Sequence, residues 1–342
     1  MPTDEAALEI AGLGVRYGAT IALADVDLRV GGGEIVALVG PSGCGKSSLL
    51  RAVAGLVPAA GGVRSAGRAL HALPAHRRGV GVVFQDHALF PHLDVAGNVA
   101  FGLVEARAPA AVRRGRTDAW LKRVGLADRA GDDVDTLSGG ERQRIALART
   151  LAPQPPLVLL DEPFASLDPN LRTRLSLEVA SWLRELGSAA LFVTHDLDEA
   201  LALGDRVAVL RAGRLVQVAP PGELMARPAD PWTARFLGHD NVWQGAAAAR
   251  LPGAPTAALL LAERARWRAG SGEAEDGTPA TCVAVASVRD GWRLELEVPA
   301  WGARVAWTAR PRELPDGAAP EVGTDGRLWA PEAAWRRWGD GG

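Results

Sequence analysis

The segment GPSGCGKSS, Gly40–Ser48, combines the residue types that bind nucleotide phosphates. Its glycines let successive backbone N–H groups form a concave anion-binding nest, Lys46 would neutralise β- and γ-phosphate oxygens, and Ser47 would bind Mg²⁺. The segment follows an apolar run and opens a helical pattern, which is the context that a phosphate loop requires. The predicted nucleotide contacts are Gly40, Pro41, Ser42, Gly43, Cys44, Gly45, Lys46, Ser47 and Ser48.

A second anion-binding pattern, LSGGE, occupies Leu137–Glu141. Ser138 would cap the helix that follows, while Gly139 and Gly140 allow a ligand to approach the backbone closely. The helix dipole favours an anion at this end. One chain therefore carries two phosphate sites of different design.

Polar residues that end three apolar runs supply the remaining candidates. Asp161 would hold Mg²⁺, directly or through water, and Glu162 would orient and deprotonate the attacking water. Gln85 would contact Mg²⁺ or that water, and His195 would hydrogen-bond the γ-phosphate. Parallel strands place such residues at one edge of a sheet. The predicted catalytic residues are thus Lys46, Gln85, Glu162 and His195, and the predicted metal ligands are Ser47, Gln85 and Asp161.

The two cysteines, Cys44 and Cys282, are too few for a zinc site or a disulfide framework. Cys44 lies next to a cation at a predicted helix N-terminus, so we expect its thiol to have a lowered pKa and to be reactive. Cys282 lacks both neighbours and is expected to be a small buried hydrophobe.

Alternation of short apolar runs with helical patterns over 34–213 predicts an α/β fold with a largely parallel sheet. Helices are expected at 46–56, 140–152 and 169–186, and an antiparallel hairpin region at 8–34. The expected architecture is a P-loop NTPase (RecA-like) core over 1–238, with an antiparallel β subdomain and a helical subdomain at about 88–135.

The chain changes character after Gly238: eight of the eleven tryptophans follow, and the segment 281–310 alternates as β-hairpins do. We expect a small β-rich, OB-like accessory domain over 239–342, entered through a linker near 245–255.

Composition constrains the partners of the chain. The 342 residues carry a net charge of −2, which disfavours a general nucleic-acid binder. We expect neither a signal peptide nor a transmembrane segment.

Taken in order, these motifs resemble the ATP-binding subunits of ABC transporters, over about residues 8–238. The resemblance implies that Gly40–Ser48 is the Walker A loop, Gln85 the Q-loop glutamine, Asp161 and Glu162 the Walker B carboxylates and His195 the switch histidine. It also implies that Tyr17 stacks on adenine and that Asp168 belongs to the D-loop. Leu137–Glu141 is similar to the family signature, with Glu141 where glutamine is commoner.

The same resemblance explains the two phosphate sites. In this family two ATPase domains pack head to tail, and ATP on one Walker A loop is capped by Ser138, Gly139 and Gly140 of the other copy. The implied cofactors are ATP and Mg²⁺, and the implied reaction is hydrolysis of ATP to ADP and phosphate.

The stretch Phe84–Leu103 is similar to importer ATPases for iron, thiamine, spermidine, sulfate and maltose, in which tyrosine is usual at the position of His87. Together with Asn241–Trp243 it looks most like the ferric-iron branch. The implied partners are membrane permease subunits at the cytoplasmic face and, indirectly, an extracytoplasmic binding protein. The alternatives are a soluble ABC ATPase acting on ribosomes or DNA, and an exporter ATPase. The first usually has two cassettes or a long coiled coil, and the second lacks an importer-type accessory domain.

Overall fold

The chain forms two compact units, Met1–Pro221 and Gly222–Gly342. The computed structural model describes residues 6–253, 255–269, 277–288, 291–310, 313–314 and 318–338. The division falls before the expected boundary at 238. Helix α8 (Pro231–Phe236) packs on β11 (Val242–Gln244) and β12 (Ala257–Leu260), and Ala234 shares a buried apolar cluster with Val242 and Leu259. These contacts make α8 part of the second unit.

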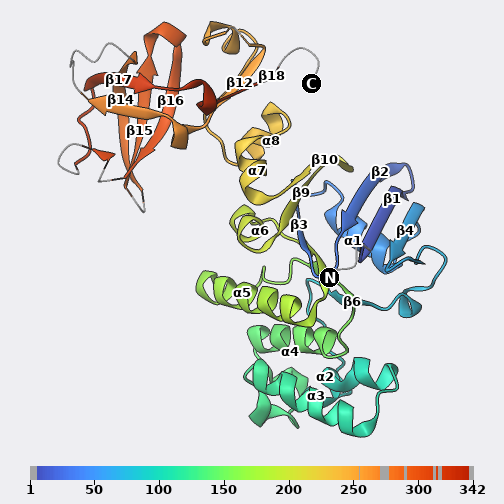
Figure 1. Cartoon of the computed structure of the whole chain (residues 1–342). Coiled ribbons are helices and arrows are strands. Elements are labelled where there is room, and N and C mark those ends of the chain that lie inside the picture. Colours follow the sequence, from blue (N-terminus) through green and yellow to red (C-terminus); the bar gives the residue numbers. More distant parts are fainter. Residues whose placement is uncertain are drawn as a thin grey trace. The chain divides into compact units, whose positions relative to one another are not determined.

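A six-stranded sheet in the order β10-β9-β3-β8-β7-β6 forms the centre of the first unit (Figure 1). Its strands are β3 Ile35–Val39, β6 Val80–Val83, β7 Leu157–Asp161, β8 Ala189–Val193, β9 Arg206–Arg211 and β10 Arg214–Ala219. All neighbours pair in parallel except β10, which runs antiparallel to β9. Every residue of β3, β7 and β8 is buried, as in a sheet that is covered on both faces. The expected α/β core is confirmed.

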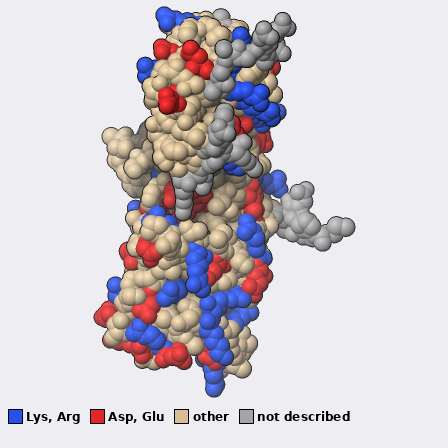
Figure 2. All heavy atoms as spheres, turned by 90° about the vertical axis from the view of Figure 1, so that its left-hand side faces the viewer, with Lys and Arg blue, Asp and Glu red and all other residues tan. Residues whose placement is uncertain are grey.

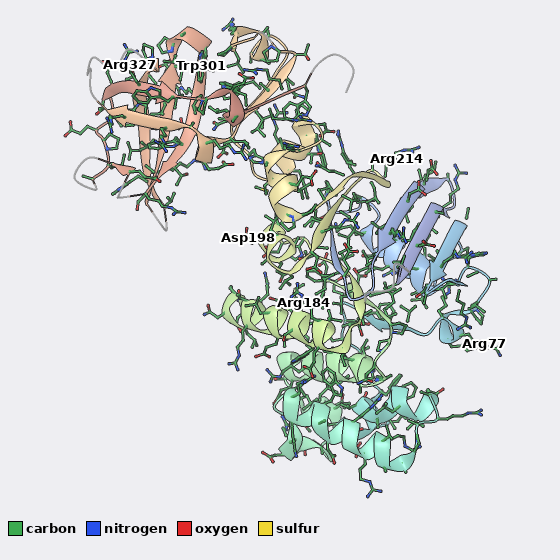
Figure 3. All side chains as sticks on the ribbon, viewed as in Figure 1. Arg77, Arg184, Asp198, Arg214, Trp301 and Arg327 are labelled. Carbon is green, nitrogen blue, oxygen red and sulfur yellow. The ribbon has the colours of Figure 1, made fainter. Side chains whose placement is uncertain are left out.

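The helices α1 (Lys46–Ala54), α5 (Pro169–Leu186) and α6 (Leu197–Leu203) pack on this sheet. Helix α5 begins at the capping residue Asp168, with Pro169 in its first turn, and ends at Gly187, whose φ of 65° closes the last turn. Arg184 of α5 (Figure 3) donates to the Leu203 carbonyl oxygen at 3.3 Å and to Asp205 Oδ1 at 3.1 Å. These bonds tie α5 to the end of α6.

The expected antiparallel region is also present, as a four-stranded sheet in the order β2-β1-β4-β5. Its strands are β1 Leu8–Tyr17, β2 Thr20–Val30, β4 Ala60–Ser65 and β5 Arg68–Ala69. Val15 and Leu23 of this sheet lie in the same buried cluster as Leu49 of α1 and Leu38 of β3. The helix that follows the phosphate loop is therefore held between the two sheets.

Helices α2 (Val95–Glu105) and α3 (Ala110–Arg123) lie in the stretch expected to be a helical subdomain, and α4 (Gly139–Leu151) packs against both. Short 3-10 turns, η2 (Ala127–Arg129) and η3 (Val134–Thr136), lead into α4. Trp120 of α3 meets Trp182 of α5 edge to face, with ring centroids 5.5 Å apart. This contact anchors the subdomain to the core helices.

The second unit is rich in β-structure. It contains α7 (Pro221–Ala226, which straddles the boundary) and α8, a sheet in the order β11-β12-β18 and a five-stranded sheet in the order β13-β17-β14-β15-β16. The remaining strands are β13 Arg266–Ala269, β14 Thr278–Val288, β15 Gly291–Val298, β16 Ala303–Ala309, β17 Asp325–Trp329 and β18 Trp335–Trp338. Trp301 (Figure 3), Leu294 and Val305 belong to its core. The expected β-rich character is confirmed, while the OB-like assignment stays a prediction.

The expected linker near 245–255 is wrong for its described residues. A 3-10 turn, η4 (Ala248–Arg250), occupies this stretch, and both Ala248 and Leu251 are buried. Small and apolar side chains that suggest a flexible connection are here packed into the second unit. Among the described residues, no helix has the length and apolar character needed to cross a membrane.

Candidate active site

The phosphate loop joins β3 to α1, and two of its glycines have backbone angles that disfavour other residues. Gly40 has a φ of 156° and Gly45 a φ of 112°. A Cβ atom on Gly45 would lie 2.5 Å from the Ala22 carbonyl oxygen and 2.8 Å from Leu23 Cδ2. Because β2 approaches the loop so closely, only glycine fits there. Pro41, Ser42 and Gly43 are exposed, which leaves the outer side of the loop open to a ligand.

Lys46 begins α1, and its side chain folds back over the loop. Its ammonium Nζ donates to the carbonyl oxygens of Gly40 at 2.7 Å and Pro41 at 3.1 Å, and the residue is 8% exposed. These bonds hold the positive charge against the loop, where phosphate oxygens can replace carbonyl oxygens as its partners.

The hydroxyl of Ser47 donates to Asp161 Oδ1 at 3.1 Å, across the gap between α1 and the end of β7. Burial raises the pKa of Asp161, and the Ser47 hydrogen bond opposes that rise. No group of three or more His, Cys, Asp or Glu side chains within the described ranges could hold a metal ion. The Ser47 hydroxyl and the Asp161 carboxylate nevertheless suit Mg²⁺, because this ion is commonly held by one or two protein oxygens while nucleotide phosphates and water complete its coordination shell.

Glu162 and His195 end the neighbouring strands β7 and β8 and meet there. Glu162 Oε2 lies 3.3 Å from His195 Nδ1, and the Glu162 N–H donates to the Val193 carbonyl oxygen at 3.0 Å. Glu162 has a φ of 47°, which is uncommon outside glycine and is sustained here by that backbone bond. The strand end therefore directs a carboxylate toward the exposed imidazole.

The segment around His195 is held by residues that the sequence analysis did not identify. Thr194 Oγ1 donates to Glu199 Oε2 at 2.6 Å, and the Asp196 carboxylate caps α6. Arg172 of α5 lies 3.7 Å from Asp196 Oδ2 and donates to the Leu167 carbonyl oxygen at 3.2 Å. Arg172 thus connects the segment before Asp168 to the segment after His195, a pairing that no local pattern signals.

Three other predicted residues lie outside this hydrogen-bonded cluster. Gln85 is exposed just beyond β6, whose partner strand is β7, and no hydrogen bond joins it to Ser47 or Asp161. Tyr17 is 45% exposed at the end of β1, opposite Thr20 of the strand that approaches Gly45. Asp168 accepts the Leu171 N–H at 3.0 Å as the cap of α5. Their contacts with a nucleotide stay predictions.

The second anion site forms the exposed start of α4. Ser138 caps the helix in a reciprocal capping box with Glu141. A Cβ atom on Gly139 would meet nothing within 4 Å, so no contact in this chain requires glycine at the first helical position. Gln143 of the same helix donates to the carbonyl oxygen of Pro163, next to Glu162. Helix α4 is therefore attached to the end of β7, although its N-terminus faces outward.

The expectation of an activated Cys44 thiol is wrong. Cys44 is 5% exposed, and burial raises the pKa of its thiol more than the nearby Lys46 lowers it. The sulfur packs inside the loop, where it would clash with a Cβ atom on Gly40. Desolvation therefore outweighs the attraction between a thiolate and the ammonium. Burial also raises the pKa of the Cys282 thiol.

Charged side chains of both signs are interspersed over the face that Figure 2 shows. This mixture accords with the small net charge of the whole chain, −2. Attraction of an anion therefore depends on local groups such as Lys46 and the start of α4.

Comparisons with known proteins point to one family. The model of the family described as "ABC transporter" matches residues 23–165. The chain is 54% identical over 229 residues to an Fe(3+) ions import ATP-binding protein of Streptomyces avermitilis, a match that covers 67% of this chain and 66% of the relative. It is 44% identical over 330 residues to a protein of the same description from Streptomyces coelicolor, with 92% of each covered. A spermidine/putrescine import ATP-binding protein of Methylococcus capsulatus is 41% identical over 315 residues, which cover 91% of this chain and 75% of that protein.

Proposed function

The chain belongs to the ABC transporter family of ATP-binding proteins, and we propose that it powers solute import through a separate membrane permease. As a member of this family it is an ATPase that converts ATP and water into ADP and phosphate. The names of its relatives support import rather than export or a role away from membranes. We propose that it works at the cytoplasmic face of the membrane, beside a permease that an extracytoplasmic binding protein supplies.

We further propose that the working unit is a homodimer with two composite ATP sites. The observation that carries this proposal is the pair of anion sites on one chain. The phosphate loop is lined by Lys46, Ser47 and Asp161, whereas the start of α4 presents Ser138 and Gly139 to solvent. A glycine that its own chain does not require fits a nucleotide arriving from a second copy.

In the proposed site each residue has one task. Lys46 and the loop N–H groups bind phosphate oxygens, and Tyr17 stacks on adenine. Glu162 accepts a proton from the attacking water. His195 hydrogen-bonds the γ-phosphate and contacts the Glu162 carboxylate, so that it positions the two groups relative to each other. Ser47 and Asp161, with Gln85, would hold Mg²⁺, which neutralises charge on the phosphates.

Mixing two inactive variants tests the composite site. Lys46→Ala removes the phosphate-loop cation, and Ser138→Arg blocks the start of α4. In a mixed dimer one site carries both defects and the other carries neither. If the sites act independently, activity returns to about a quarter of the wild-type rate, because about half of the dimers are mixed and one of their two sites is intact. Verified mixed dimers without activity would contradict independent capping in trans.

Transport is tested in the native host. We propose ferric iron as the cargo, since two of the relatives named above import Fe(3+) ions. Deletion of the gene should reduce uptake of radiolabelled ferric iron and leave spermidine uptake unchanged. Loss of spermidine uptake alone would assign the chain to the other group of relatives, and normal uptake of both would remove the cargo proposal.

A further inference from the structure

Both hydrogen-bond donors of Ser138 are directed at a carboxylate of the same chain. The Ser138 N–H donates to Glu141 Oε2 at 2.8 Å, and its hydroxyl donates to the same oxygen at 2.7 Å. These donors are the ones that a γ-phosphate at the start of α4 needs. The negatively charged glutamate therefore already binds the two donors that the proposed function assigns to an anion.

Arg129 binds the other oxygen of that carboxylate. Its Nη1 donates to Glu141 Oε1 at 2.9 Å, while its Nε donates to Asp132 at 2.8 Å and its Nη2 to Thr136 at 3.1 Å. Arg129 lies in η2, outside α4, so this contact forms only when the loop is folded against the helix. The Ser138 donors, followed by Arg129, lower the pKa of Glu141 to about 2. Glu141 is thus ionised at neutral pH.

An ionised glutamate beside an incoming phosphate is a cost that a glutamine would not impose. Two negative groups within several ångströms repel by an amount that reduces affinity many-fold at a half-exposed site. A guanidinium on the far oxygen offsets this repulsion and weakens the hold of the carboxylate on the Ser138 hydroxyl. Glu141 together with Arg129 can therefore take the place of a neutral glutamine, because the guanidinium offsets charge on the carboxylate.

We propose that Arg129 is a positioning residue for ATP capture: it holds Glu141 and offsets part of its negative charge, so that Ser138 can donate to the γ-phosphate bound by a second copy. This proposal rests on the composite site proposed above. It predicts that Arg129 matters only while position 141 carries a charge. A merely structural ion pair predicts the opposite, because then loss of either partner, or of both, weakens the fold alike.

The test uses the full chain with Glu162→Gln, so that ATP is bound without turnover, and measures the ATP concentration at which half of the protein is dimeric. Arg129→Gln should raise that concentration roughly tenfold. Glu141→Gln should leave it equal or lower, and the double variant should match Glu141→Gln. Arg129→Lys keeps the charge and should stay near the parent value. High salt should shrink the effect of Arg129→Gln, since mobile ions screen the repulsion.

Arg174→Gln is the matched control, because Arg174 also forms an ion pair, at 3.0 Å with Glu178, but this pair lies within α5 and includes neither Ser138 nor Glu141. It should change nothing, and unfolding midpoints of all variants should identify any loss of stability. A double variant that is as impaired as Arg129→Gln would overturn the proposal. A parent that binds ATP yet stays monomeric would overturn the composite site as well, and a parent that binds no ATP would overturn the proposed function itself.

Discussion

Single residues at the strand ends derive their roles from backbone geometry and burial together. Glu162 adopts a φ of 47°, which directs its carboxylate to 3.3 Å from His195. One residue earlier, Asp161 is buried and hydrogen-bonded to Ser47. The two adjacent carboxylates therefore occupy different environments: that of Asp161 suits a metal ion, and that of Glu162 suits an attacking water.

Cys44 illustrates how burial decides reactivity. Because its pKa is raised, the thiol stays protonated at neutral pH and thiolate forms only as the pH rises toward the raised value. We expect brief maleimide treatment at neutral pH to leave Cys44 unmodified, and labelling to accelerate about tenfold for each pH unit below the pKa. Mass spectrometry of the labelled protein measures both. If Cys44 were labelled rapidly at neutral pH and MgATP prevented this labelling, the result would contradict our prediction and support an activated thiol.

At the scale of elements, one side chain organises the start of the helical subdomain. Asn98 of α2 is fully buried, accepts the Phe90 N–H at 2.8 Å, and donates to the carbonyl oxygens of Phe90, Leu93 and Asp94 at 3.0–3.1 Å. It fixes the loop that precedes α2, within the stretch Phe84–Leu103 that resembles importer ATPases.

Asn98→Ala should reduce the free energy of unfolding by about 2–3 kcal/mol, because it leaves several buried backbone groups without partners. ATP binding should persist, since the phosphate contacts lie on the central sheet and α1. Urea unfolding and nucleotide titration measure the two effects. Arg114→Ala, at an exposed position of α3, is the control and should stay within about 0.5 kcal/mol of the wild type. An Asn98→Ala protein of normal stability would contradict the role of this loop anchor.

For the whole molecule, the division into two units separates the ATP site from the β-rich unit. Every predicted phosphate and metal residue precedes Pro221. The apolar cluster that includes Ala234 needs strands from beyond residue 240, since it also contains Val242, Leu259 and Trp338. The behaviour of a truncated chain should therefore depend on whether the truncation removes α8 together with the strands that cover it, rather than on the number of residues removed.

A chain that ends at 221 should bind ATP with nearly the affinity of the full protein. A chain that ends at 238 should bind ATP as well but aggregate more, because α8 then lacks the strands that cover it. Nucleotide titration and light scattering on the matched pair measure affinity and aggregation. If the shorter chain is folded yet binds no ATP, the β-rich unit is part of the site; equal solubility of the two would argue against the boundary at 221.

Local patterns determined much of this protein. The order of apolar runs specifies the parallel sheet, since strands buried on both faces read as continuous apolar segments. The spacing from Gly40 to Ser47 specifies the loop, and Ser138 specifies a capped helix start. These features depend on residues a few positions apart, and the structure contains each of them.

Contacts between distant segments were decided only by the tertiary structure. The pairing of Arg129 with Glu141, the bridge from Arg172 to Asp196 and the burial of Cys44 have no periodic signature. The same holds for the boundary at 221, because α8 is assigned to a unit by the strands it packs on rather than by its composition. Burial and charge pairing arise when separate segments fold together, and a linear pattern records neither which segments meet nor how much water remains between them.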